Sequence, residues 1–216
     1  MKATWVGIIA AALWVPPPVT AQSHEITLGV TGGFSFADVK TDDPELGDTF
    51  RRNAVAGGVF MSFRANDRIV VVPNLLYQQQ GFRVDNADAD ATFKVDYVTL
   101  PLLLQVDLTQ ANRLRPRIFA GPSIGFQALC GVSGIVDGVD DDYDCDDPEI
   151  DVNTATTVYA LVVGAGVDWQ VGRWILGVEG RYDYGLTDLD VDPQAPMQKL
   201  RTYSILGRIS LGFSEM

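Results

Sequence analysis

The residues that could do chemistry in this chain are its charged side chains, because the single histidine is His24. Hydrolysis by a Ser–His or Asp–His pair needs a histidine placed against the substrate. His24 follows an apolar N-terminal run and precedes the first predicted strand, so we interpret it as a linker residue. The sequence therefore argues against an envelope hydrolase.

A set of charged residues falls on one face of the predicted strands. The set consists of Arg117, Asp168, Glu179, Arg181, Asp183 and Arg208. Paired carboxylates of this kind can carry acid–base catalysis. The same residues can instead form a salt-bridge network that fills a narrow interior, where buried charges need partners. We favour the network and expect no catalytic residues.

The segment 137–151 is strongly acidic and contains no lysine or arginine. Calcium takes several carboxylate and carbonyl oxygens as ligands. The best candidate ligands are Asp140, Asp141, Asp142 and Asp144, although their spacing does not match the loop of an EF-hand. The alternative is a solvated loop whose charge is screened at the cell surface. Loosely bound calcium is the only cofactor that the sequence suggests.

The two cysteines, Cys130 and Cys145, bracket most of this acidic segment. Two cysteines in an exported protein usually pair, so we predict a disulfide between them. In the chain-entropy model, closing a loop of about 16 residues contributes roughly 3 kcal/mol. A zinc site needs three or four ligands and no histidine lies nearby, so the disulfide is the better interpretation.

The N-terminus has the features of a secretory signal. Lys2 gives a positive start, residues 5–15 form an apolar run, and small residues precede a predicted cut after Ala21. We expect a signal peptide over residues 1–21 and one barrel domain over 22–216. The net charge of −12 argues against a nucleic-acid partner, because phosphates require a basic surface.

Segments that alternate with a period of two must position the charged residues. Such alternation places two sets of residues on opposite faces of a strand. In the first segment Ile26, Leu28 and Val30 share one parity, with Thr27 and Gly29 on the other. The predicted strands cover residues 25–38, 53–64, 68–82, 92–108, 114–129, 155–170, 173–186 and 201–213.

The connections between these segments alternate between short polar turns and long acidic loops, as in outer-membrane barrels. The predicted long loops cover residues 42–52, 85–91, 131–154 and 187–199. We therefore predict an all-β fold, an eight-stranded antiparallel up-and-down transmembrane β-barrel with periplasmic turns and acidic extracellular loops. A soluble periplasmic barrel that binds a hydrophobic ligand is the alternative. Small residues on the polar parity favour the membrane barrel, since they suit a narrow interior. So do aromatic residues near strand ends on the apolar parity. These are Tyr77, Trp169, Trp174, Tyr182, Tyr184 and Tyr203.

Four strands resemble those of the PorT-like outer-membrane β-barrel family. The segment 97–104 (YVTLPLLL) resembles one characteristic strand, and 119–125, 181–188 and 207–213 resemble three later ones. The resemblance implies a barrel in the outer membrane of a Gram-negative-type cell, with outer-membrane lipid and other envelope proteins as partners. We expect a small non-enzymatic barrel with a structural, adhesive or accessory role.

Overall fold

The computed structural model describes residues 26–40, 49–86, 89–109, 113–136, 139–144, 156–188 and 199–213. The predicted signal peptide, His24 and Cys145 lie outside the described residues. No helix among the described residues is long and apolar enough to cross a bilayer.

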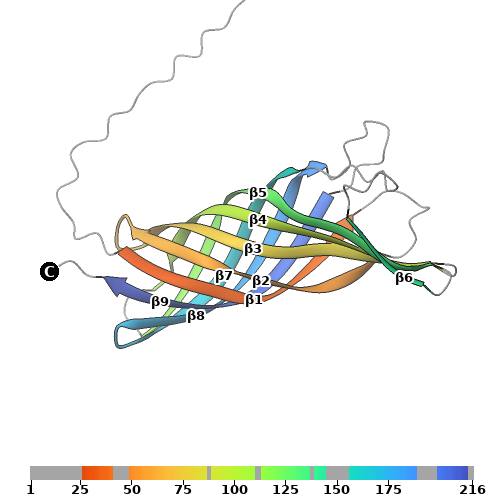
Figure 1. The fold of residues 1–216 in the computed structure, drawn as a ribbon. Helices are drawn as coiled ribbons and strands as arrows, with labels where there is room; N and C mark the ends of the chain where they lie inside the picture. The colour runs from red at the N-terminus through yellow and green to blue at the C-terminus, as the bar shows by residue number, and fades with distance from the viewer. Residues whose placement is uncertain are drawn as a thin grey trace, which may run out of the picture.

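Antiparallel strands close into a barrel (Figure 1). The strands are β1 (Ile26–Lys40), β2 (Thr49–Arg64), β3 (Ile69–Asn86), β4 (Ala89–Asp107), β5 (Leu114–Val136), β6 (Val139–Asp144), β7 (Thr157–Val171), β8 (Trp174–Asp188) and β9 (Lys199–Phe213). Each barrel strand pairs with the next one along the chain, with β5 pairing directly with β7, and the β1–β9 and β4–β5 pairings complete the ring. All of these strands except β6 form the ring, so the prediction of an eight-stranded up-and-down barrel is confirmed.

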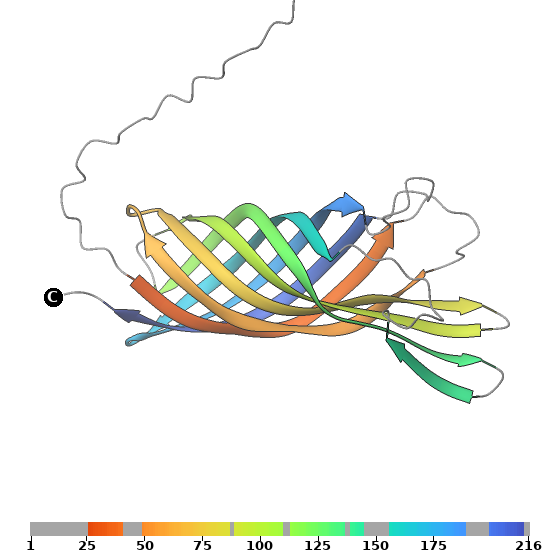
Figure 2. The same ribbon diagram turned by 45° about the horizontal axis from the view of Figure 1, so that its top comes forward.

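The strand β6 corrects the prediction of one long loop over 131–154. Strand β5 continues to Val136, and β6 folds back on it with Val136 opposite Val139. The intervening dipeptide in the sequence is Asp137-Gly138, and an Asp-Gly pair between two strands is a strong signal for a two-residue hairpin turn. The predicted loop at 85–91 is likewise mostly strand, because Asn86 pairs with Ala89. Both hairpins extend beyond the barrel (Figure 2).

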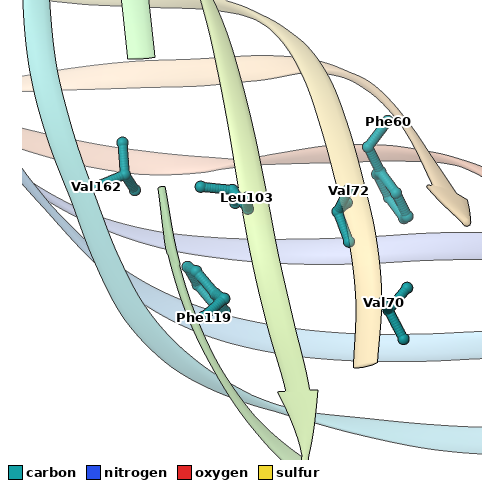
Figure 3. Packing of buried hydrophobic residues seen from close by; sticks show 6 residues of the cluster. All are labelled: Phe60, Val70, Val72, Leu103, Phe119 and Val162. Atoms are coloured by element: carbon teal, nitrogen blue, oxygen red, sulfur yellow. The ribbon is translucent and has the colours of Figure 1, made fainter. Parts of the chain in front are cut away.

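The two faces of the barrel strands differ sharply in polarity. Large apolar side chains such as Leu28, Leu102 and Ile205 are exposed on the outer wall. Most buried side chains inside are polar, with a small apolar cluster among them (Figure 3). The cluster comprises Phe60, Val70, Val72, Leu103, Phe119 and Val162. The alternative of a soluble barrel around a hydrophobic ligand is therefore wrong, because it requires the opposite arrangement.

The two ends of the barrel are also distinct. Short connections join β2 to β3, β4 to β5 and β7 to β8 at one end, where the start of β1 pairs with the end of β9. Gly172 in the β7–β8 turn has a positive φ of 63°, a conformation that favours glycine. Short turns of outer-membrane barrels face the periplasm, so we name this the periplasmic end and the other the extracellular end.

Candidate functional site: the charged lumen

Glu179 on β8 is the centre of a buried ion-pair network inside the barrel. Its side chain is 1% exposed. Its Oε2 lies 2.6 Å from Nη2 of Arg117 and 3.4 Å from Nη1 of Arg208. Its Oε1 accepts from Arg181, whose Nη2 is 2.5 Å away. Three guanidinium groups therefore share one carboxylate.

Asp168 on β7 is a second acceptor for two of these arginines. Its Oδ2 lies 3.0 Å from Nε of Arg117, and its Oδ1 lies 3.9 Å from Nε of Arg208. Strand order explains the meeting, because β5, β7, β8 and β9 are consecutive neighbours in the barrel. Parity turns these charged residues inward, and the strand register, in which Gly166 lies opposite both Arg117 and Glu179, brings them to similar heights.

Glycines opposite the charges make room for them. In the strand register Gly166 faces both Arg117 and Glu179, and Gly177 faces both Asp168 and Arg208. A Cβ atom on Gly166 would lie 2.9 Å from Nη2 of Arg117. A Cβ atom on Gly177 would collide with Asp168 and Arg208. The inward glycines thus decide where long charged side chains fit in the lumen.

Two inward aromatic rings complete the network. The guanidinium of Arg208 lies 3.9 Å from the ring centre of Phe60. Those of Arg117 and Arg181 lie 5.3 and 5.7 Å from the ring centre of Phe119. All three separations suit cation–π attraction. Neither ring was predicted from the sequence, although Phe60 and Phe119 are large apolar residues at positions of their strands that otherwise carry small or polar residues.

Asp183 differs from the other predicted network residues, because it accepts a hydrogen bond from an amide. Its Oδ2 accepts from Gln78 at 3.2 Å, and Oε1 of Gln78 accepts from Thr99 at 3.2 Å. Arg181 also donates to Asn74 at 3.0 Å. The structure therefore joins five of the six predicted charges directly and places Asp183 among amides above them.

Small cavities lie on the two sides of the network. The extracellular cavity holds about 40 Å³ of water-accessible space and is bordered by Gln78, Asp183 and Thr202. The periplasmic cavity holds about 30 Å³ and is bordered by Asp107, Asp168 and Arg208. Each accommodates only a few waters. The network between them separates the two halves of the lumen.

The charges of the predicted set balance. Arg117, Arg181 and Arg208 supply three positive charges, and the carboxylates of Asp168, Glu179 and Asp183 can supply three negative ones. Burial of charge is tolerated when partners and hydrogen bonds are present. The arrangement suits a permanent filling of the lumen better than a catalytic centre, because Arg117 and Glu179 are both almost inaccessible to a substrate.

The predicted calcium ligands and the disulfide lie away from the lumen. Asp140, Asp141, Asp142 and Asp144 stand on β6 and not in the irregular loop that we expected. The side chains of these four aspartates lie outside the described part of the structure, so calcium binding stays a prediction; among the side chains that the structure describes, no group of three or more acidic, histidine or cysteine residues could hold a metal. Cys130 is on β5, and no cysteine that the structure describes is free. Its predicted partner is outside the described residues, so the pairing stays a prediction.

An apolar outer wall around a polar, filled interior defines the class of small outer-membrane β-barrels. The chain belongs to the outer membrane protein beta-barrel domain family, whose model matches residues 20–191. The localisation is therefore the outer membrane, where the outer wall meets membrane lipid. No curated protein sequence matches the chain.

Two solved structures share the fold at low sequence identity. Neisserial surface protein A (NspA) superposes with a TM-score of 0.53 at 15% identity, covering 87% of this chain and 97% of the other. The outer membrane protein OprG from Pseudomonas aeruginosa gives a TM-score of 0.54 at 12% identity, covering 89% of this chain and 98% of the other. These similarities support the barrel architecture.

Proposed function

We propose that this protein is a non-enzymatic outer-membrane barrel that presents an acidic β-sheet at the cell surface in an adhesive role. The observation that carries the proposal is the combination of a filled lumen with strands that project beyond the membrane. A membrane-crossing β-strand needs about 9–11 residues. Strand β5 has 23 residues and β4 has 19, whereas β1 has 15.

The projecting part forms a continuous sheet. Pairing between β4 and β5 continues from Asp107–Arg117 near the periplasmic end to Asp90–Ile135 at the extracellular end. Strand β6 adds to this sheet and pairs only with β5 among the described strands. Its sequence carries four aspartates in six residues. An acidic sheet held above the membrane favours contact with positively charged surfaces.

The filled lumen supports a role outside the barrel. An eight-stranded barrel has an interior just wide enough for side chains. Here the interior is occupied by the Glu179 network and by Phe60 and Phe119. Solute transport through the lumen therefore has no support, and neither does catalysis on a substrate inside it. The alternative is a structural or accessory role, in which the same projecting sheet would contact another envelope protein.

The remaining sequence predictions extend this proposal. Removal of residues 1–21 as a signal peptide would deliver the barrel domain for insertion. A Cys130–Cys145 disulfide would tie β5 to the segment after β6, and calcium on Asp140, Asp141, Asp142 and Asp144 would bridge the acidic sheet to other surface anions. The resemblance of four strands to the PorT-like family supports membership of that group.

A hairpin replacement tests the proposal. Residues 131–154 are replaced by a Gly-Asn turn, which removes β6 and keeps the pairing of β5 with β7. Heat-dependent mobility on a gel verifies folding, and adhesion of cells that express each variant to cationic and host-cell surfaces is counted. We expect an unchanged barrel and a loss of most adhesion.

A matched variant changes only Asp140, Asp141, Asp142 and Asp144 to Asn and keeps the hairpin. We expect an intermediate loss, because the strand remains and its charge is removed. Equal adhesion by all three proteins, with the barrel folded in each, would reject the adhesive role.

A further inference from the structure

An exposed arginine lies within or at the end of each short connection at the periplasmic end of the barrel. Arg68 ends the β2–β3 turn, Arg113 precedes β5, and Arg173 lies in the β7–β8 turn. We name Arg68, Arg113 and Arg173 the arginine rim. All three side chains are exposed to solvent in the isolated chain. The rim is unexpected in a chain whose net charge is −12.

Positive charge exceeds negative charge at this end among the described residues. Arg64 and Arg115 lie just inside the rim, and the neighbouring carboxylates are Asp67, Asp107 and Asp168, the last of which is paired with Arg117. Nη1 of Arg64 is 3.0 Å from Oδ2 of Asp107, so this carboxylate already has a cationic partner. Nη2 of Arg115 donates to Gln170 at 2.7 Å. The rim arginines are thus available for an anion from outside the chain.

Two tryptophans fix the depth of the rim relative to the membrane. Trp169 and Trp174 are 53% and 48% exposed on the outer wall. Trp169 pairs with Leu114, and Trp174 pairs with Val171 across the β7–β8 turn. Tryptophan concentrates at the level of the lipid headgroups. Arg113 and Arg173 directly precede Leu114 and Trp174, so their guanidinium groups lie at the depth of the phosphates.

We propose that the arginine rim binds the phosphate groups of anionic phospholipids in the periplasmic leaflet. The planar guanidinium group donates two parallel hydrogen bonds to a phosphate. The exposed apolar side chains of Leu114, Val171 and Trp174 make the rim continuous with the lipid-facing wall. This continuity favours a lipid over an acidic protein or a cell-wall polymer, neither of which needs an apolar border. The inference is independent of the adhesive role at the opposite end.

The chain contains its own reporters for the test. The four tryptophans are Trp5, Trp14, Trp169 and Trp174, and the first two lie within the predicted signal peptide, so protein prepared without residues 1–21 keeps only the two beside the rim. This protein is folded into phosphatidylcholine vesicles that contain either brominated phosphatidylglycerol or brominated phosphatidylcholine. Bromine quenches tryptophan fluorescence on contact, so the two quenching curves give the relative affinity for the anionic lipid.

We expect phosphatidylglycerol to bind about fivefold more tightly than phosphatidylcholine, which is the effect of about one basic residue at a lipid surface. In the variant Arg68→Gln, Arg113→Gln, Arg173→Gln the ratio falls to about one. A matched variant with Lys40→Gln, Arg83→Gln and Lys199→Gln removes the same charge from the extracellular ends of strands and keeps the preference.

Folding of every variant is verified by heat-dependent gel mobility before quenching is measured. A ratio near one in the starting protein would overturn the proposal, as would an unchanged ratio in the rim variant. An equal loss in the matched variant would also overturn it, because net charge would then be the cause. Retention on purified cell wall without a lipid preference would assign the rim to a different partner and reject the lipid.

Discussion

Val178 and Glu179 are neighbours in β8, yet their side chains occupy opposite environments. Val178 is 61% exposed on the outer wall, and Glu179 is 1% exposed within the lumen. The alternation of a β-strand produces this difference without any change of fold. The side chains of the outer wall suit contact with hydrocarbon, whereas the charged side chains of the lumen must form ion pairs with one another. Each face therefore tolerates a different kind of substitution.

Removal of the central carboxylate should have the largest effect. Glu179→Ala leaves Arg117, Arg181 and Arg208 buried with much less compensating charge. Breaking a buried ion pair costs about 3–5 kcal/mol of unfolding free energy. Urea unfolding of the protein in lipid vesicles, followed by tryptophan fluorescence, measures the change.

Glu179→Gln is the control for shape, because the amide oxygen still accepts one guanidinium hydrogen bond. We expect it to recover part of the loss. A loss in Glu179→Ala below about 1 kcal/mol, the value typical of exposed pairs, would mean that the network is hydrated and not buried.

A charge on the outer wall should cost less. Val178→Arg places a guanidinium against hydrocarbon between the aromatic residues Trp174 and Tyr182. Such substitutions on a barrel wall cost about 2–4 kcal/mol near the bilayer midplane. The same unfolding assay measures it, with Val178→Leu as an apolar control that should leave stability unchanged. Equal stability of the arginine variant would show that position 178 does not face lipid.

A larger side chain at an inward-facing glycine should destabilise the barrel, although by less than a charge on the outer wall. In Gly164→Ala the new Cβ would collide with the ring of Phe119 and with the carbonyl of Gly180. Overpacking of this kind costs about 1–3 kcal/mol. Gly180→Ala is the matched control on the adjacent strand, because nothing lies within 4 Å of its added Cβ. Equal losses in the two variants would contradict the assignment of Gly164 to the lumen.

The smallest effect is expected outside the barrel. Cys130→Ser with Cys145→Ser removes the predicted disulfide of the projecting hairpin. Because the closing pairs β4–β5 and β5–β7 continue without it, we expect barrel stability to change by less than about 0.5 kcal/mol, as for surface substitutions. Non-reducing gels verify the disulfide in the parent protein. A large loss of barrel stability would show that the hairpin supports the barrel wall.

The barrel was predictable because its signal is repeated. Every barrel strand alternates apolar and small or polar residues, so an error at one strand leaves the others intact. The inward charges followed from the same parity, since Arg117, Asp168 and Glu179 fall opposite apolar neighbours. Their contacts depend on the register between strands, which parity does not specify.

The inward aromatic rings and the β5–β6 hairpin could not be predicted from the alternation of residues along each strand. Phe60 and Phe119 are apolar residues on a polar face, and they fit because Gly29 and Gly164 lie against their rings. That fit is a three-dimensional property of neighbouring strands. The hairpin of β5 and β6 had a local signal in Asp137-Gly138, but the acidity of the surrounding residues favoured a loop. The acidic composition indicated that this segment is exposed to solvent, but it did not indicate whether the backbone forms a strand or a loop.

Single-channel recording in planar bilayers tests the central claim most directly, namely that the Glu179 network closes the lumen. Protein whose folding is verified by heat-dependent gel mobility is inserted alongside a general porin as a positive control for insertion. We predict no stable conductance steps from the wild-type protein at neutral pH, because the Glu179 network and its arginine partners occupy the lumen. A large, stable single-channel conductance from the wild-type protein would contradict it.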